Sequence, residues 1–274
     1  MQTHEQLTAH FEIERALADK LKSATKEARR TLYKEVYDEL FRQVPHHPQL
    51  TARESRQRRV ARSVRQVRFL RSLASGRPVF LEVGPGDCLT SLEMAKHAEA
   101  VYAVDVSREI TSEIDPPKNF HLLLSDGCSI EVAAESVDLA FSNQLMEHLH
   151  PEDAVAQLRN IHRALKPSGR YLCITPNRFS GPHDVSQHFG TIACGLHLRE
   201  YALAELLQLF RDAGFSRFRT YIGKDGLYVR CPLWLCRMLE STIGVLPARA
   251  RKRVGKFAPF RLLLGIRLLA SKAG

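Results

Sequence analysis

The chain has 274 residues, of which 44% are hydrophobic and 26% are charged, with 40 lysines and arginines against 30 acidic residues. This length corresponds to one large domain, or to one domain with extended ends, and the apolar share excludes a disordered or collagen-like chain. The uncharged apolar runs fall far short of the ~20 residues that a membrane-spanning helix needs.

The two ends of the chain differ in charge from its centre. Residues 1–78 carry a net charge of +8, residues 79–222 carry −7 and residues 223–274 carry +9. This distribution predicts a catalytic core whose ends contact something anionic. The first residues lack a cationic start followed by an apolar block, so we predict no signal peptide and a cytoplasmic protein. The six cysteines include no Cys-x-x-Cys pair and are expected to be reduced thiols.

The first 78 residues are predicted to be helical. Residues 4–43 contain neither glycine nor proline, and the segment Pro45–Pro48 interrupts them before a basic helix over Thr51–Leu73. Val60, Val64, Val67 and Leu70 share one face of this helix and are expected to pack on the core. Its arginines either face solvent or form a phosphate- or nucleic-acid-binding surface.

From residue 79 short apolar runs alternate with helical spacing, which predicts βαβ units and a parallel sheet. The predicted strands are 79–83, 101–105, 120–124, 137–141 and 170–175, and the segments 215–222 and 227–231 flank a hairpin turn. We therefore expect an α/β fold with a Rossmann-like, doubly wound sheet of five parallel strands and a C-terminal hairpin. The predicted units are a helical extension (1–78), the α/β domain (79–231) and a basic, apolar tail (232–274).

A cofactor site is predicted at the carboxyl ends of these strands. Gly84 and Gly86 follow the first strand, where they allow the backbone to approach a ligand closely. Asp105 ends the second strand, 19 residues after Gly86, and is placed to bind two ribose hydroxyls. Leu89 stands where a nicotinamide-binding fingerprint has its third small residue, and no Gly-Lys-Ser/Thr of a P-loop follows.

The ordered motifs resemble the class I S-adenosylmethionine-dependent methyltransferases over residues 79–231. They are Glu82-x-Gly84-x-Gly86, Asp105, Ser125-Asp126-Gly127, Asn143 to Leu149, and Leu165-Lys166-Pro167-Ser168-Gly169. The resemblance implies that S-adenosyl-L-methionine is the cofactor. It further implies that the glycines contact the methionine part, Glu82 its amino end, Asp105 the ribose and Asp126 the adenine. The implied cofactor-binding residues are Glu82, Gly84, Gly86, Asp105, Val106, Asp126, Gly127 and Asn143.

Histidines provide candidates for a general base, which assists transfer to a hydroxyl or an amine. His148 follows the fourth strand, while His183, Asp184 and His188 lie in the insert of about residues 176–200 that is expected to form the acceptor pocket. We expect His183 or His188 to be the base, with Asp184 orienting one of them, and His148 to be a further catalytic candidate. A metal site formed by these three insert residues lacks a fourth ligand, so no metal is predicted.

The acceptor is predicted to be a hydroxyl of a small molecule or of a glycan. The composition of the tail suggests that such a glycan is lipid-linked. Ser142-Asn143-Gln144-Leu145 lacks the Asn/Asp-Pro-Pro-aromatic motif of enzymes that methylate base amines. The tail mixes apolar residues with cations, which is typical either of a segment on an anionic membrane surface or of a cover for the core. Alternatives are an RNA methyltransferase using the arginine helix, and a non-catalytic protein that binds cofactor or partners. Nucleic acid is the less favoured partner, and the oligomeric state is left open.

Overall fold

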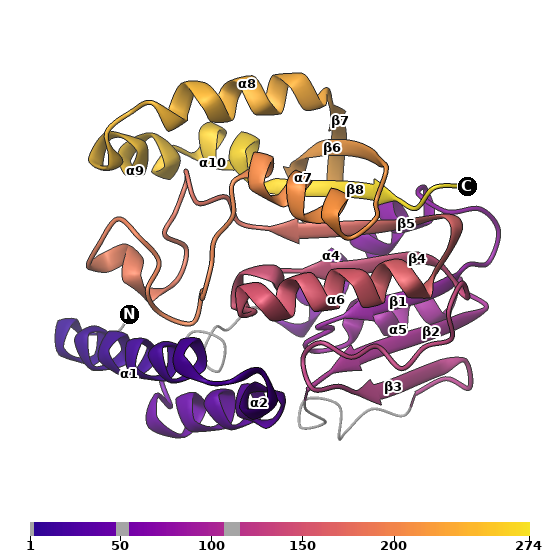
Figure 1. Ribbon diagram of the computed structural model, residues 1–274, viewed down its shortest axis with the longest axis horizontal. Coiled ribbons are helices and arrows are strands. Elements are labelled where there is room, and N and C mark those ends of the chain that lie inside the picture. Colours follow the sequence, from indigo (N-terminus) through magenta and orange to yellow (C-terminus); the bar gives the residue numbers. More distant parts are fainter. Residues whose placement is uncertain (1–2, 48–54, 107–115) are drawn as a thin grey trace.

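The structure is a computed structural model that describes residues 3–47, 55–106 and 116–274. Within these residues, eight strands form one sheet in the order β3-β2-β1-β4-β5-β8-β6-β7 (Figure 1). The first five pair in parallel, as predicted: β1 (Val79–Val83), β2 (Ala100–Asp105), β3 (Phe120–Leu124), β4 (Val137–Asn143) and β5 (Leu165–Thr175). Their carboxyl ends therefore lie along one edge of the sheet, where ligands bind in folds of this type.

The antiparallel part of the sheet differs from the prediction in one strand. The hairpin is present as β6 (Arg217–Lys224) and β7 (Leu227–Cys231), but it does not pair with β5. β8 (Ile266–Ser271) lies between them and is antiparallel to both β5 and β6. The end of the predicted tail is thus an internal strand, in which Ile266, Leu268 and Leu269 are buried.

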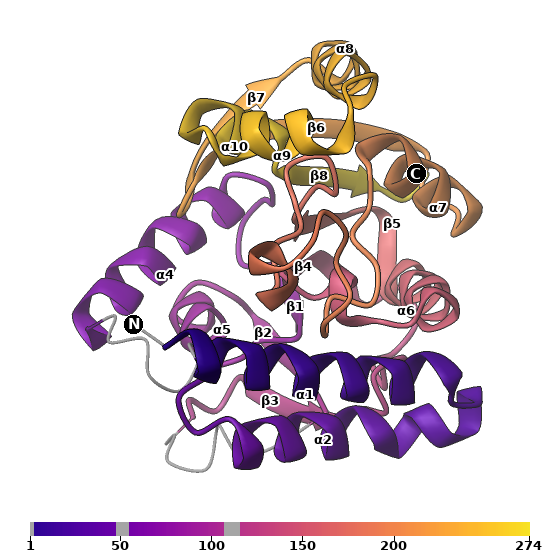
Figure 2. The same ribbon diagram turned by 90° about the vertical axis from the view of Figure 1, so that its left-hand side faces the viewer.

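Helices cover both faces of the sheet (Figure 2). α4 (Arg56–Arg71) and α5 (Leu89–Ala95) lie on one face, and α6 (Pro151–Ala164) and α7 (Leu203–Asp212) lie on the other. Alternate residues of β1 point to opposite faces, so Phe80 and Leu81 belong to two different apolar clusters. The rest of the tail forms α8 (Leu233–Gly244), α9 (Ala248–Lys256) and α10 (Ala258–Leu264).

The predicted helical segment of residues 4–43 consists of two helices. α1 (His4–Ser23) ends before Thr25, whose hydroxyl accepts a hydrogen bond from the Ala28 amide and caps α2 (Lys26–Gln43). Both helices lie beyond the carboxyl ends of the strands, beside the insert that follows β5 (Figures 1 and 2). The extension is therefore placed to cover the ligand-binding edge of the sheet.

The basic helix α4 packs on the core with only part of the predicted apolar face. Val67 and Leu70 are buried, but Val60 and Val64 are 38% and 37% exposed. The predicted residues 51–54 lie outside the described residues. Arg59 pairs with Asp87, which ties the solvent side of this helix to the turn after β1.

In the described part of the chain, every helix is too short or too polar to cross a lipid bilayer.

Candidate functional site

The turn between β1 and α5 forms the first part of the site. Gly84 and Gly86 have φ values of +68° and +54°, a region that favours glycine. A Cβ atom on Gly84 would meet the side chain of Leu145 at 3.0 Å, whereas a Cβ on Gly86 would meet nothing within 4 Å. Cys88 has a φ of +54° and begins α5. This turn thus leaves open space beside its backbone at the end of β1.

Glu82 lies beneath that turn and is almost fully buried. The hydroxyl of Ser91 donates a hydrogen bond to its carboxyl group. Burial raises the pKa of Glu82 to about 8, with the nearby acidic groups Asp87 and Asp105 adding to the effect. A carboxyl group with such a pKa is poised to ionise when a cation binds beside it.

Asp105 and Asp126 end the two neighbouring strands. The Val106 amide donates to Oδ1 of Asp105 at 2.7 Å, which fixes the orientation of this carboxylate at the tip of β2. Asp126 accepts from the amides of Cys128 and Ser129 at 3.0 and 2.7 Å, and so shapes the turn after β3. Burial opposes its ionisation, but these hydrogen bonds prevail and the pKa of Asp126 is lowered.

Residues from the extension and from the end of β4 complete this edge. Gly127, with a φ of +88°, lies against the ring of Tyr33 from α2, where a Cβ would approach the ring to 2.9 Å. Asn143 is the exposed last residue of β4, and Gln144 follows it with a φ of +57°. The structure therefore places all the predicted cofactor residues along the carboxyl edge of β1 to β4.

Beside this edge lies a cavity of about 410 Å³. Its walls come from α1, α2, the segment after β4 and the insert, and six histidines line it: His10, His47, His148, His183, His188 and His197. The predicted base candidates thus share one cavity with histidines from the N-terminal extension. Sequence reasoning did not single out His10 and His47, because residues so far from the predicted insert in the chain give no signal of a shared cavity.

Glu200 organises two of these histidines. Its Oε1 accepts from the His183 amide at 2.7 Å and lies 2.8 Å from Nδ1 of His197, while its Oε2 lies 3.3 Å from Nδ1 of His183. Burial opposes ionisation of this group, but the hydrogen bonds from both histidines lower its pKa to about 2. Glu200 is therefore a carboxylate at neutral pH that orients two imidazole rings.

Asp184 has other partners. It caps the short helix η3 (Val185–His188), where its Oδ1 accepts from the Ser186 amide, and its Oδ2 accepts from the Gly195 amide. Among the described residues, its carboxylate oxygens accept from these amides and form no hydrogen bond with His183 or His188. The carboxylate that contacts His183 is that of Glu200, which the sequence placed in the acceptor insert without assigning it this role.

His148 lies in the short helix η2 (Met146–His148) at the end of β4. Its Nδ1 is 3.0 Å from the carbonyl oxygen of Leu196, and its ring meets the ring of His197 at 4.8 Å between centroids. Burial lowers the pKa of His148 to about 3, with the neighbouring His197 adding to the effect. His148 is thus neutral at physiological pH and is a weak base.

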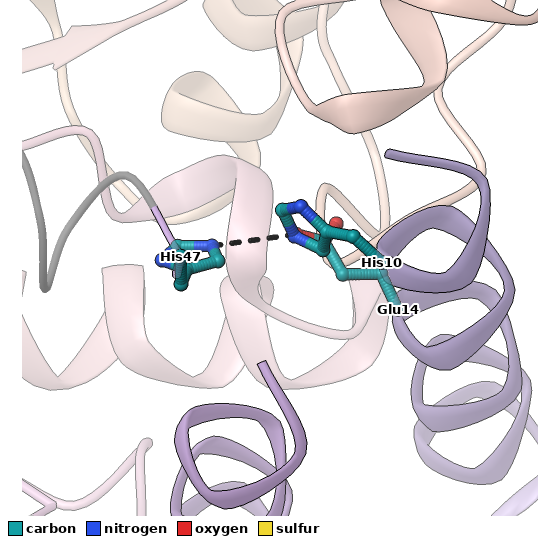
Figure 3. A group of neighbouring side chains, drawn as sticks. All are labelled: His10, Glu14 and His47. Atoms are coloured by element: carbon teal, nitrogen blue, oxygen red, sulfur yellow. Dashed lines mark hydrogen bonds and ion pairs between the residues drawn. The ribbon is translucent and has the colours of Figure 1, made fainter. Parts of the chain in front are cut away.

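A second buried group lines the same cavity (Figure 3). Nε2 of His10 lies 2.8 Å from Oε1 of Glu14, and Nε2 of His47 lies 3.5 Å from the same oxygen. Oε2 of Glu14 accepts from the Leu196 amide at 3.2 Å. Burial opposes ionisation of Glu14, but these hydrogen bonds lower its pKa to about 2. The group therefore ties α1 to the loop after α2 and to the insert.

Comparison with known protein families finds a match within the central part of the chain. A protein-family model described as a methyltransferase domain matches residues 81–173, which run from β1 to the end of β5. No curated protein matches the chain significantly.

Two solved structures share the fold. A chain in the complex between the Haloferax volcanii Trm112 methyltransferase activator and a methyltransferase is 17% identical, with 78% of this chain and 91% of that chain covered and a TM-score of 0.53. A SAM-dependent methyltransferase from Thermotoga maritima is 16% identical, with 78% and 89% covered and a TM-score of 0.52. At this level of identity the likeness concerns the fold.

Proposed function

Since residues 81–173 match a methyltransferase-domain model, we propose that the chain is a class I S-adenosylmethionine-dependent methyltransferase that transfers a methyl group to a hydroxyl of a small molecule or glycan. The single observation that carries the acceptor proposal is the histidine-lined cavity beside the cofactor edge, in which Glu200 orients His183 and His197. A histidine oriented by a carboxylate suits an acceptor that must lose a proton during transfer.

S-Adenosylmethionine is the cofactor, and the residues at the carboxyl edge fit it. The open space at Gly86 admits a ligand, the buried carboxyl group of Glu82 suits the amino end, and the fixed carboxylate of Asp105 suits the ribose. We propose these contacts, together with Asp126 and Gly127 at the adenine. When bound, the cofactor supplies a methyl group already activated as a sulfonium, so the protein has chiefly to align the acceptor and accept its proton.

Among the predicted bases, the contacts favour His183. Its Nδ1 faces the Glu200 carboxylate, which stabilises the imidazolium formed when the ring accepts a proton. Its Nε2 lies 3.2 Å from the hydroxyl of Ser180. His188 is an exposed residue of the cavity wall, and within the described part of the chain it has no comparable carboxylate partner. We therefore propose His183 as the base and Glu200 as the residue that positions it.

The test is methyl transfer from radiolabelled S-adenosylmethionine to a panel of free and lipid-linked saccharides. On the acceptor found, we expect His183→Ala to lower kcat by about 100-fold, the usual size of a general-base effect, with cofactor affinity unchanged. His188→Ala is the matched control and is expected to retain most activity. Full activity of His183→Ala would refute this assignment of the base, and transfer only to non-hydroxyl acceptors would refute the acceptor class.

A lipid-linked acceptor, bound from the inner face of the membrane, is the narrower form of this proposal. Trp234 and Met238 of α8 and Phe257 before α10 remain 66%, 51% and 62% exposed, close in sequence to many cations. Such side chains suit contact with anionic lipid. We expect Trp234→Ala combined with Met238→Ala to reduce sedimentation with anionic vesicles. Unchanged sedimentation would count against the membrane contact, while leaving the soluble acceptor open.

An RNA acceptor is the competing proposal, because several arginines of α4 face solvent: Arg56, Arg58, Arg68 and Arg71. Binding of RNA that weakens steeply with salt, together with methyl transfer to RNA, would favour it over the glycan.

A further inference from the structure

Three side chains at the end of β4 and in the insert form a group suited to a metal ion. One donor atom each from Glu147, His148 and His197 lies within 4.8 Å of the other two. Glu147 and His148 are adjacent in η2, and His197 reaches them from the insert. The two histidines also line the cavity proposed to bind the acceptor.

The hydrogen bonds of both imidazole rings determine which nitrogen can bind a ligand. Nδ1 of His148 faces the carbonyl oxygen of Leu196, which only accepts, so this nitrogen carries the proton and Nε2 keeps its lone pair. Nδ1 of His197 likewise faces the carboxylate of Glu200, which leaves Nε2 as its ligating atom. Histidines that bind metals almost always donate their other N–H to a carbonyl or carboxylate in this way.

Glu147 supplies the independent observation that points to a ligand. The residue is fully buried, and its Oε2 accepts from the hydroxyl of Thr175 at 2.9 Å. Its Oε1 is buried and has no hydrogen-bond partner. A buried carboxyl oxygen without a hydrogen-bond partner destabilises the folded protein. Because this oxygen lies beside two oriented imidazole rings, we infer that it binds a ligand.

The neighbouring group in Figure 3 differs in this respect. The carboxylate of Glu14 is already bonded by His10 and by the Leu196 amide, and His47 lies near it. The carboxylate of that group already has hydrogen-bond partners, and we interpret the group as one that holds the N-terminal extension in place. Glu147, whose Oε1 has no such partner, therefore belongs to the better candidate metal site.

We propose that Glu147, His148 and His197 bind a divalent transition-metal ion, with zinc as the first candidate. Two histidines and one glutamate are a known ligand set for catalytic zinc, which keeps a further position open. Zinc binds such donors at about 2.0–2.2 Å, and the three donor atoms here already lie within 4.8 Å of one another.

The use of this metal deepens the proposed function and rests on it. A hydroxyl bound to a divalent cation loses its proton more readily, so the ion would prepare the acceptor oxygen for transfer while His183 accepts the proton. The binding of the metal itself does not depend on the identity of the acceptor.

The experiment is titration of the metal-free full-length protein with Co²⁺, followed by its visible absorption, and competition with Zn²⁺. We expect one ion per chain and a spectrum typical of nitrogen and oxygen ligands in a four- or five-coordinate site. His148→Ala and His197→Ala should each weaken binding by at least tenfold. Glu200→Gln should weaken it by about tenfold, the lower end of the range for residues that orient a ligand.

His10→Ala is the matched control, because it removes a histidine of the neighbouring group in the same cavity. Its metal affinity should equal that of the wild type. Loss of binding in His10→Ala but not in His148→Ala would place the ion at Glu14, and absence of any specific absorption would refute a site; either result overturns the proposal. Circular dichroism of each variant, and the more conservative His197→Gln, separate loss of a ligand from loss of the fold.

These measurements need no acceptor, so they separate this inference from the proposed function. Metal binding without transfer to any hydroxyl would refute the function and leave the site intact. If the protein binds no cobalt and its hydroxyl methylation is unchanged by metal removal, the metal site is refuted and the proposed function stands.

Discussion

Arg29 and Asp153 join the N-terminal extension to the α/β domain through a buried ion pair. Nε of Arg29 lies 2.6 Å from Oδ2 of Asp153, and Nη2 lies 3.0 Å from Oδ1. Both side chains are almost completely buried, and the hydroxyl of Tyr33 donates to the same carboxylate at 2.7 Å. The helices that cover the ligand-binding edge are therefore fastened to α6 by a fully bonded pair of charges.

Removal of one partner should destabilise the protein severely. In Asp153→Asn the charge of Arg29 loses its buried counter-ion and keeps only the exposed Glu152, and loss of a buried partner typically costs about 3–5 kcal/mol. We expect a loss of this size in the free energy of unfolding by urea. Glu152→Gln is the matched control, since Glu152 contacts the same arginine but is largely exposed, and little change is expected. Equal losses in both variants would show that burial does not govern this contact.

Cofactor binding should depend on pH through Glu82. Its pKa is about 8, so below that pH the carboxyl group must lose a proton before it can pair with the cationic amino group of the cofactor. Affinity for S-adenosylmethionine should therefore rise by up to tenfold for each pH unit between 6 and about 8 and then level off. Calorimetric titration across this range measures the slope. Glu82→Gln should bind S-adenosylmethionine more weakly, and its affinity should depend less on pH. If the pH dependence of the variant equals that of the wild type, the titrating proton belongs to another group.

Asp105 should be required for cofactor binding but not for folding. Its carboxylate lies at the half-buried end of β2, and we expect Asp105→Ala to weaken binding of S-adenosylmethionine and S-adenosylhomocysteine by more than tenfold, because two charge-assisted hydrogen bonds to the ribose are lost. Thermal unfolding should change little. Micromolar binding by the variant would contradict the predicted ribose contact, and absence of binding by the wild type would favour a non-catalytic protein.

Glu14 should stabilise the protein at neutral pH and not in acid. Its pKa falls from an ordinary 4.5 to about 2 on folding, so its contribution is fully present above pH 4.5 and is lost as the pH falls towards 2. Glu14→Gln should lower the free energy of unfolding by about 3 kcal/mol at pH 7. The difference from the wild type should shrink below pH 4.5, as urea unfolding at several pH values can show. A difference independent of pH would indicate lost packing instead of lost charge.

The sequence was sufficient to predict the parallel part of the sheet, because each strand there is a short apolar run beside a turn or a helix. β8 was missed for a physical reason. Arg267 and the neighbouring cations give its segment the composition of a surface region, and only the pairing with Arg170–Thr175 on one side and β6 on the other makes it a strand. Pairing between strands so far apart in the chain cannot be recognised from the local sequence pattern.

The helix α4 shows the same limit on the scale of single residues. The spacing of its valines is correct, but the core contacts only the half of the helix that holds Val67 and Leu70. Gln66 is buried instead and accepts from the hydroxyl of Tyr228 in β7, a contact that no helical period reveals.

Candidate site residues could be named from the sequence where they end or directly follow a predicted strand, as at Gly84, Asp105 and Asn143. Its remaining members come together only in the folded chain. His10 belongs to the first helix and Glu200 to the segment before α7, and their roles are set by contacts across the cavity. The spacing of His10 and Glu14, one turn apart on a helix, was the one local signal of the group in Figure 3.

The position of β8 also constrains the order in which the molecule can be assembled during synthesis. The ribosome delivers β5, β6 and β7 well before residues 266–271, so the nascent chain exposes one edge of β5 and one edge of β6 until the sheet can be completed. Unpaired strand edges are templates for association with other chains. The late joining of two half-sheets by a single strand makes this interval the step at which molecular chaperones would matter most.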